Sequence, residues 1–183
     1  MYAVERRWTL HGAGRQLQQL SFSRLVWKFI YTQLYPDSAV SPNDILEDSL
    51  PMIDDNIHVF SSAIAIFHAP SDISAGITGM RHEHIRATSS WRNGPARYDF
   101  VLVNTDPDIN SDSLRAGGFE IGCVFLFFSF WHQDKEYPFA LIQWFSFVGL
   151  EPDEDTGHWL VEPDVDADTG QPHIAVVHLN SIY

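Results

Sequence analysis

The hydrophobic pattern of the chain is clearest between Cys123 and Gly149, where two runs rich in aromatic and β-branched residues flank a polar break. This pattern predicts two paired antiparallel strands. Both faces of the second run are largely apolar, so both must be covered, as in the wall of a small barrel or the middle of a sandwich. Alternate residues assign Phe139, Leu141, Gln143, Phe145 and Phe147 to one face and Ala140, Ile142, Trp144 and Ser146 to the other.

The remaining pattern predicts a helical front and a β-rich back. Leucines and aromatics recur at near-helical spacing between Arg15 and Tyr35 and predict one amphipathic helix. Residues 36–56 contain three prolines and several acids, which is typical of a linker or surface loop. Further elements are expected at 58–68 (a strand, or a short buried helix), 76–88 (a turn with a strand or short helix), 98–103, 158–161 and 173–179 (strands).

The fold class is therefore mainly β (α+β). We expect residues 1–56 to form a helical extension and an acidic, proline-containing loop. Residues 57–183 are expected to form a β-rich domain, either a small β-barrel or an open sandwich. A chain of 183 residues with 45% hydrophobic content can bury one such core.

From the composition, we expect the chain to lie inside the cell, in the nucleus or cytoplasm. No run of eighteen apolar residues is present, which excludes a membrane-spanning helix. The first residues lack the apolar stretch of a secretory signal. The single cysteine, Cys123, lies inside an apolar strand, so we expect a small buried hydrophobe and no disulfide within the chain.

Charge is unevenly distributed along the chain. Residues 101–183 carry two Lys or Arg against fourteen Asp or Glu, and the whole chain has a net charge of −13. Because phosphates repel acidic surfaces, nucleic acid is not expected to bind the C-terminal half, whereas a basic, histone-like protein partner would suit it. The alternative is an acidic surface that only aids solubility.

One cationic cluster stands apart from this acidic background. Arg81, Arg86, Arg92 and Arg97 lie close together in the sequence, with Trp91 among them. Arginines interleaved with aromatics can grip phosphates and stack on bases. Alternatively, they pair with the acidic turns of the C-terminal half.

Metal chemistry has two candidates in the sequence. His82 and His84 would lie on one face of a strand and could chelate zinc, given a third ligand from Asp72, His58 or His68. The alternative is a pair of surface histidines. The alternating acids Asp164, Asp166 and Asp168 resemble the start of a calcium loop, but Thr169 stands where that loop needs glycine, so a hairpin turn with side-chain capping is expected.

No nucleotide-binding glycine pattern or hydrolase elbow is present. The sequence therefore assigns no catalytic residue, no metal site and no cofactor.

Several sequence segments, taken in their order along the chain, resemble a known group of proteins. These segments are Gly79–Arg86, Trp91–Asp99, Leu126–Phe130, Tyr137–Phe145, Glu151–Pro163 and His173–Leu179. They are similar to the C-terminal region of proteins encoded by basidiomycete fungal transposons of the CACTA-like Plavaka and Kyakuja–Dileera–Zisupton types, and to related uncharacterised fungal proteins. The resemblance covers residues 57–183 and implies an accessory region without an assigned activity. The end at Ile182–Tyr183 departs from the family, in which the chain continues, so a truncated or decayed copy without function is an alternative.

A weaker likeness, at the level of the fold, is to bromo-adjacent homology (BAH) modules and other small chromatin-reading barrels. It implies a partner-binding surface of aromatics and acids, made of Trp131, Trp144, Phe145, Trp159, Glu151, Asp153 and Asp155. The alternative is that all four aromatics are core residues.

The expected function is that of a non-catalytic accessory interaction module, with a basic protein as its partner. The alternatives are a DNA-contacting accessory domain that uses Arg81 to Arg97, or a metal-dependent enzyme around His82 and His84.

Overall fold

The computed structural model describes residues 6–51, 56–68, 80–105, 118–132, 134–167 and 169–183. Two α-helices, α1 (Leu10–Gln16) and α2 (Phe22–Leu34), precede most of the strands. The strands are β1 (Arg6–Thr9), β2 (Asn56–Phe60), β3 (Ser62–His68), β4 (Met80–Thr88), β5 (Arg97–Tyr98), β6 (Phe100–Asn104), β7 (Phe119–His132), β8 (Lys135–Phe147), β9 (Val161–Pro163) and β10 (Ile174–His178). Short 3-10 helices occupy Glu47–Ser49 and Leu179–Ser181. Neither α1 nor α2 has the length and apolarity that crossing a membrane requires, and the described residues hold no other α-helix.

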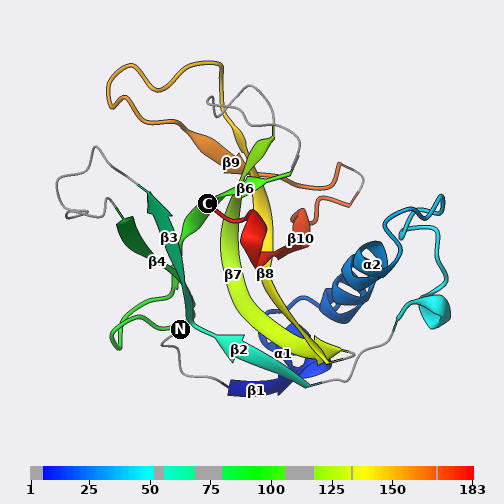
Figure 1. The fold of residues 1–183 in the computed structure, drawn as a ribbon. Helices are drawn as coiled ribbons and strands as arrows, with labels where there is room; N and C mark the ends of the chain where they lie inside the picture. The colour runs from blue at the N-terminus through cyan, green and yellow to red at the C-terminus, as the bar shows by residue number, and fades with distance from the viewer. Residues whose placement is uncertain (1–5, 52–55, 69–79, 106–117, 133, 168) are drawn as a thin grey trace.

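The long β7–β8 hairpin is the centre of the larger sheet, which runs β1-β2-β7-β8-β10. Strand β6 pairs with the first half of β7, and β9 pairs with the end of β8. Strands β3, β4 and β5 form a second sheet. Figure 1 shows the curved hairpin with the helices to one side and β3 and β4 to the other. Most of the regular structure is strand, which confirms the mainly β class. The strand pairs are antiparallel, and the sheets are not closed into a barrel.

Each face of the hairpin belongs to a different hydrophobic core. Phe139 and Leu141 lie in a first core with α1 and α2, whereas Ala140, Ile142 and Trp144 lie in a second core with residues of β3, β4 and β6. The predicted alternation along β8 is therefore confirmed. Because both faces are covered, the helices of the N-terminal segment and the β-rich part share one structure.

A β-bulge changes the face to which β7 directs its side chains. The register with β8 shifts between Val124 and Leu126. Both are even-numbered residues, yet Val124 lies in the second core and Leu126 in the first. One extra residue, Phe125, inverts the alternation and adds local twist.

The expectation of one helix from Arg15 to Tyr35 is wrong, because α1 ends before α2 begins. The Gln19 N–H donates to the Gly14 carbonyl (2.7 Å) and the Gln18 N–H to the Arg15 carbonyl (3.2 Å). Gln18 has a φ of 56°, so this is a Schellman C-cap with glutamine in the left-handed position that glycine usually takes. The leucine spacing continues through the break and so conceals it.

Three expected strands differ in their bounds. Residues 58–68 belong to two strands, β2 and β3, which meet at Ser61. The Ser61 carbonyl accepts a hydrogen bond from the Ala87 N–H (3.0 Å), and from this point β3 pairs with β4 in the second sheet. Residues 98–103 are divided by Asp99 into β5 and β6. Strand β9 begins only at Val161, because residues 158–160 belong to the preceding loop.

The last residues of the chain cross the second face of the hairpin. After β10, Leu179 and Ile182 pack against the second core. Tyr183 and Leu102 then exchange two backbone hydrogen bonds (2.8 and 3.3 Å), which adds the C-terminal residues to the free edge of β6. This crossing helps to cover the face that the helices leave open.

Phe139 offers a direct test of the first core. It is 1% exposed, and its ring lies 5.0 to 6.1 Å from the rings of five neighbours, namely Phe29, Phe128, Phe130, Tyr137 and His178. Phe139→Ala should lower the free energy of unfolding by about 3–5 kcal/mol, measured by urea denaturation. Leu20→Ala, at a side chain 87% exposed, should change it by less than about 0.5 kcal/mol. Similar losses in the two variants would contradict the assignment of the core.

His178 should make stability depend on pH. Its Nδ1 caps the 3-10 helix Leu179–Ser181 by accepting from the Asn180 N–H (3.1 Å), so the capping ring is neutral. Burial, with the nearby charge of Lys135, lowers the pKa of His178 below its ordinary value of 6.5. The unfolded chain therefore takes up the proton more readily. The stabilisation is complete above about pH 6.5 and decreases as the pH falls towards the folded-state pKa.

His178→Ser keeps a capping oxygen but does not titrate. Relative to the unmodified protein, the variant should lose less stability between about pH 7.5 and pH 5 in urea denaturation. Parallel losses in both proteins would contradict this role of His178.

Candidate functional site

The structure does not bring the four predicted partner-binding aromatics together. Trp131 pairs with Glu136 near the turn of the hairpin and is 61% exposed. Phe145 lies nine residues further along β8, about 30 Å away if the strand is extended. Trp144 is 8% exposed and belongs to the second core, so its assignment to a partner surface was wrong. Trp144 and Phe145 differ in burial because they are consecutive residues of β8, whose side chains point to opposite faces of the sheet.

Two aromatic pairs lie instead at the end of the sheet where β6, β8 and β9 meet. The ring centroids of Phe100 and Phe145 are 4.8 Å apart, and those of Phe147 and Trp159 are 5.0 Å apart. The register places Phe145 and Phe147 on the same face of β8. We call these four residues the aromatic end.

Phe100 and Phe147 were absent from the partner-binding surface that the sequence predicted. Phe100 is 53% exposed and reaches Phe145 because β6 pairs with β7 and β7 pairs with β8. Such a contact depends on strand order, for which the sequence carries no local signal. Three exposed apolar residues follow β8 in the adjoining loop, namely Val148, Leu150 and Leu160.

Acidic turns adjoin the aromatic end. The Asp153 carboxylate accepts hydrogen bonds from the Thr156 N–H (2.9 Å) and hydroxyl (2.8 Å), and these bonds lower the pKa of Asp153. Asp166 and Thr169 repeat the arrangement at 2.8 and 2.7 Å. The expected capped turn is confirmed, and it occurs twice because the sequence D-x-D-T-G occurs twice.

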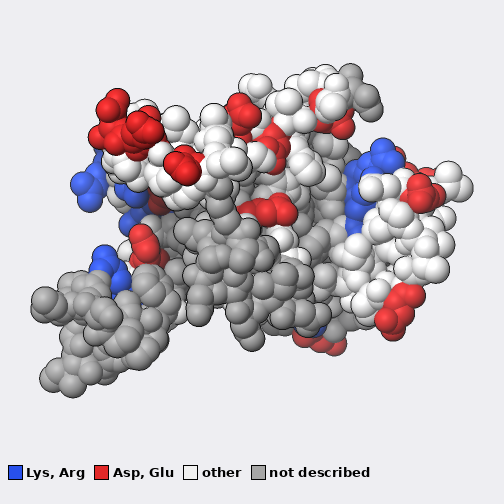
Figure 2. Space-filling model, turned by 90° about the horizontal axis from the view of Figure 1, so that it is seen from above, with Lys and Arg blue, Asp and Glu red and all other residues white. Residues whose placement is uncertain are grey.

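Asp153 and Asp166 hold the turns through these hydrogen bonds, whereas other acids near Asp153 face the solvent. Glu151, Glu154 and Asp155 are exposed. Figure 2 looks down on the side that carries β9 and shows Asp and Glu in several groups over this surface. Residues 148–173, which connect β8 to β10 and contain β9, hold eight Asp or Glu and no Lys or Arg, so this segment is uniformly acidic. A positively charged partner would be attracted to it.

Three of the four predicted arginines gather around one indole ring. The guanidinium carbons of Arg86, Arg92 and Arg97 lie 4.2, 5.3 and 5.6 Å from the centroid of Trp91. Arg81 lies five residues before Arg86 on β4, about 17 Å along the strand, and is not part of this group. We call Arg86, Trp91, Arg92 and Arg97 the arginine turn.

A tight turn produces this arrangement. The Gly94 N–H donates to the Trp91 carbonyl (2.9 Å), and Arg92 and Asn93 have φ angles of 51° and 62°. These are the signs of a type I′ hairpin turn. The turn joins β4 to β5, which bears Arg97.

The ion pair made by the arginine turn is local. The Arg97 Nε lies 2.8 Å from an Asp99 oxygen, and this hydrogen bond raises the pKa of Arg97. Asp99 also accepts from the Arg86 backbone N–H (2.9 Å). For the arginine turn, the described residues therefore do not bear out the alternative of pairing with the C-terminal acids.

His82 and His84 are exposed on β4, where they pair with Ile66 and Ile64. Within the described ranges, no group of three or more His, Cys, Asp or Glu is placed to hold a metal ion. Of the proposed third ligands, Asp72 lies outside the described residues, and His58 belongs to β2 of the other sheet. Nothing is described of the His68 side chain.

Cys123 is buried, as the sequence predicts. Its sulfur lies 3.9 Å from the Tyr98 carbonyl oxygen. Burial, followed by the negative charge of Asp99, raises the pKa of the thiol. The thiolate that a nucleophile requires is therefore disfavoured.

Comparison of the chain with protein-family models, with curated proteins and with solved structures found no match.

Proposed function

We propose that this protein is a non-catalytic interaction module that binds a basic segment of a protein partner at its aromatic end. The observation that carries the proposal is the Phe100–Phe145 ring pair, in which Phe100 is exposed and Phe145 half-buried, next to residues 148–173, which contain eight Asp or Glu and no Lys or Arg. Lys and Arg side chains bury their aliphatic stems on aromatic rings and keep their charge near carboxylates. The aromatic rings and the acidic turns offer these two contacts together.

The sequence resemblance extends this proposal to the biological setting. The chain would be an accessory module of a fungal transposon-derived protein. A histone-like partner has the basic segments that the aromatic end and its acidic turns would accept.

A fluorescent Lys/Arg-rich peptide tests the main proposal by fluorescence anisotropy. Phe100→Ala and Trp159→Ala should each weaken binding about tenfold, because each removes an aromatic contact. Trp131→Ala is the matched control, since this exposed tryptophan of β7 lies beside the start of β8, far from Phe145, and its loss should leave binding unchanged. An equal loss in the control, or no binding at low salt, would contradict the proposal.

The acidic turns have a separate test. Replacing Glu151 and Glu154 by Gln and Asp155 by Asn should weaken binding of the peptide and reduce the dependence of its affinity on salt. Asp153 stays unchanged in this variant because its carboxylate holds the turn. An unchanged salt dependence would show that these acids do not contribute.

Nucleic-acid contact by the arginine turn is the second candidate function. Its support is the gathering of three guanidinium groups, of which Arg97 alone has a carboxylate partner among the described residues. If a single-stranded oligonucleotide binds there, Arg86→Gln and Arg92→Gln should each weaken its binding. Each should also reduce by about one the slope of the logarithm of the binding constant against the logarithm of the salt concentration. Arg24→Gln, on α2, is the control. Absence of oligonucleotide binding at low salt would end this candidate and leave the peptide proposal intact.

A further inference from the structure

A cavity of about 340 Å³ lies between the N-terminal segment and the second sheet. Its walls come from β1, the end of α1, the β2–β3 junction, the end of β4, β5 and the bulge of β7. The volume is at the small end of the range for small-molecule sites. The cavity is separate from the aromatic end, and none of the four residues of that end lines it.

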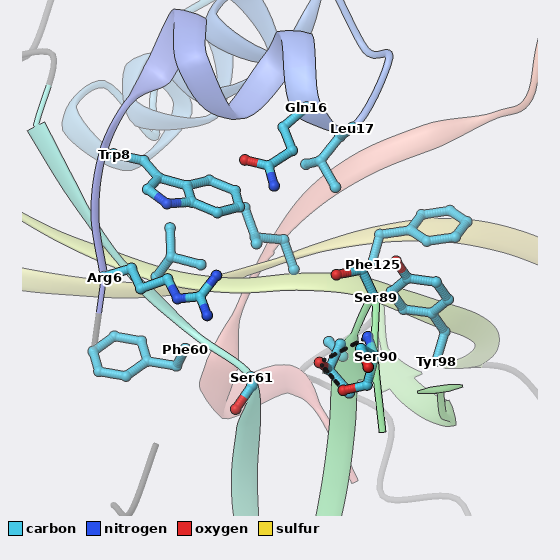
Figure 3. A pocket seen from close by; sticks show the side chains of 14 residues that line it. Arg6, Trp8, Gln16, Leu17, Phe60, Ser61, Ser89, Ser90, Tyr98 and Phe125 are labelled. Atoms are coloured by element: carbon cyan, nitrogen blue, oxygen red, sulfur yellow. Dashed lines mark hydrogen bonds between the residues drawn. The ribbon is translucent and has the colours of Figure 1, made fainter. Parts of the chain in front are cut away.

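The cavity has flat aromatic walls. Trp8 lies on the side of α1, while Tyr98 and Phe125 lie across from it (Figure 3). The Tyr98 and Phe125 rings pack edge to face with centroids 5.3 Å apart, which fixes their orientation. Phe125 is the residue at the bulge of β7, and bulges commonly redirect a side chain at a functional site. This geometry suits a planar ring.

The charge of the lining is the opposite of that of the chain as a whole. Arg6 is the one charged residue among the described residues that line the cavity, and Figure 3 shows its guanidinium pointing into the space. Among the residues that the structure describes, no Asp or Glu lines it, although the chain has a net charge of −13. Arg6 has no carboxylate partner among the described residues. A guanidinium in such surroundings favours a carboxylate or a phosphate.

Hydroxyl groups complete the polar part of the wall. Ser61, Thr88, Ser89 and Ser90 line the side next to the arginine turn. The Thr88 hydroxyl donates to the Ser90 carbonyl (2.9 Å) and accepts from the Ser90 N–H (3.3 Å), so this wall is held in place. A serine hydroxyl can donate a hydrogen bond to an anionic oxygen.

We propose that this cavity binds a small planar organic anion, that is, one aromatic ring bearing a carboxylate or phosphate group. The ring would lie between Trp8 and Tyr98, and its anionic group would pair with Arg6. Such a site is a small-molecule site in addition to the peptide surface of the proposed function, and neither depends on the other.

Titration of the ¹⁵N-labelled full chain tests the proposal by NMR, with benzoate, phenyl phosphate and benzyl alcohol as probes. We expect saturable shifts at the Trp8 indole N–H and the Ser89 and Ser90 amides with at least one anion. The neutral alcohol should bind at least about tenfold more weakly, because it cannot pair with Arg6. Benzoate alone, phenyl phosphate alone or both would identify which anionic group the site accepts.

Two variants separate a specific site from general attraction. Arg6→Gln should remove the preference for the anions, while Arg7→Gln, which does not line the cavity, should retain it. Both arginines are exposed, so the fold should persist, and the dispersion of the amide spectrum verifies this. The proposal is overturned if no probe gives saturable shifts, if benzyl alcohol binds as well as the anions, or if both variants behave alike.

Discussion

The structure depends on one constraint, which is that the β7–β8 hairpin is apolar on both faces. A sheet of this kind is stable in water only when each face is covered. Helices α1 and α2 cover the first face, and β3, β4 and the C-terminal residues cover the second. The helices, β3 and β4 precede the hairpin in the sequence and the C-terminal residues follow it, so the hairpin determines where distant parts of the chain must lie.

Local patterns in the sequence predicted the features that follow from side-chain periodicity, namely the alternation along Phe139 to Phe147 and the existence of β10. The end of α1 depends instead on one left-handed residue, Gln18, and the exchange of faces in β7 depends on one extra residue, Phe125. Single backbone conformations of this kind leave the hydrophobic period almost unchanged, and so the pattern cannot show them.

The candidate sites followed the same rule. The sequence WRNG brought Arg92 and Arg97 near Trp91 through a local turn, and the acidic turns are encoded by a repeated five-residue segment. The Phe100–Phe145 contact and the cavity around Arg6 join segments far apart in the chain. The charge imbalance of the sequence corresponds to different elements, since the acidic turns adjoin β8 and β9 whereas the arginine turn joins β4 to β5.

The position of the hairpin within the chain has a consequence for how the protein folds. Residues 119–147 are consecutive, so β7 and β8 can pair early, at little cost in loop closure. The helices precede this hairpin in the chain, whereas β10 and the crossing C-terminal residues follow it. During synthesis, the helices, β3 and β4 are already present when the hairpin forms, whereas the part of the second face that residues 174–183 cover waits for them. Until these residues are made, part of an apolar face and the edges of β6 and β8 remain open, and surfaces of this kind favour association with other chains.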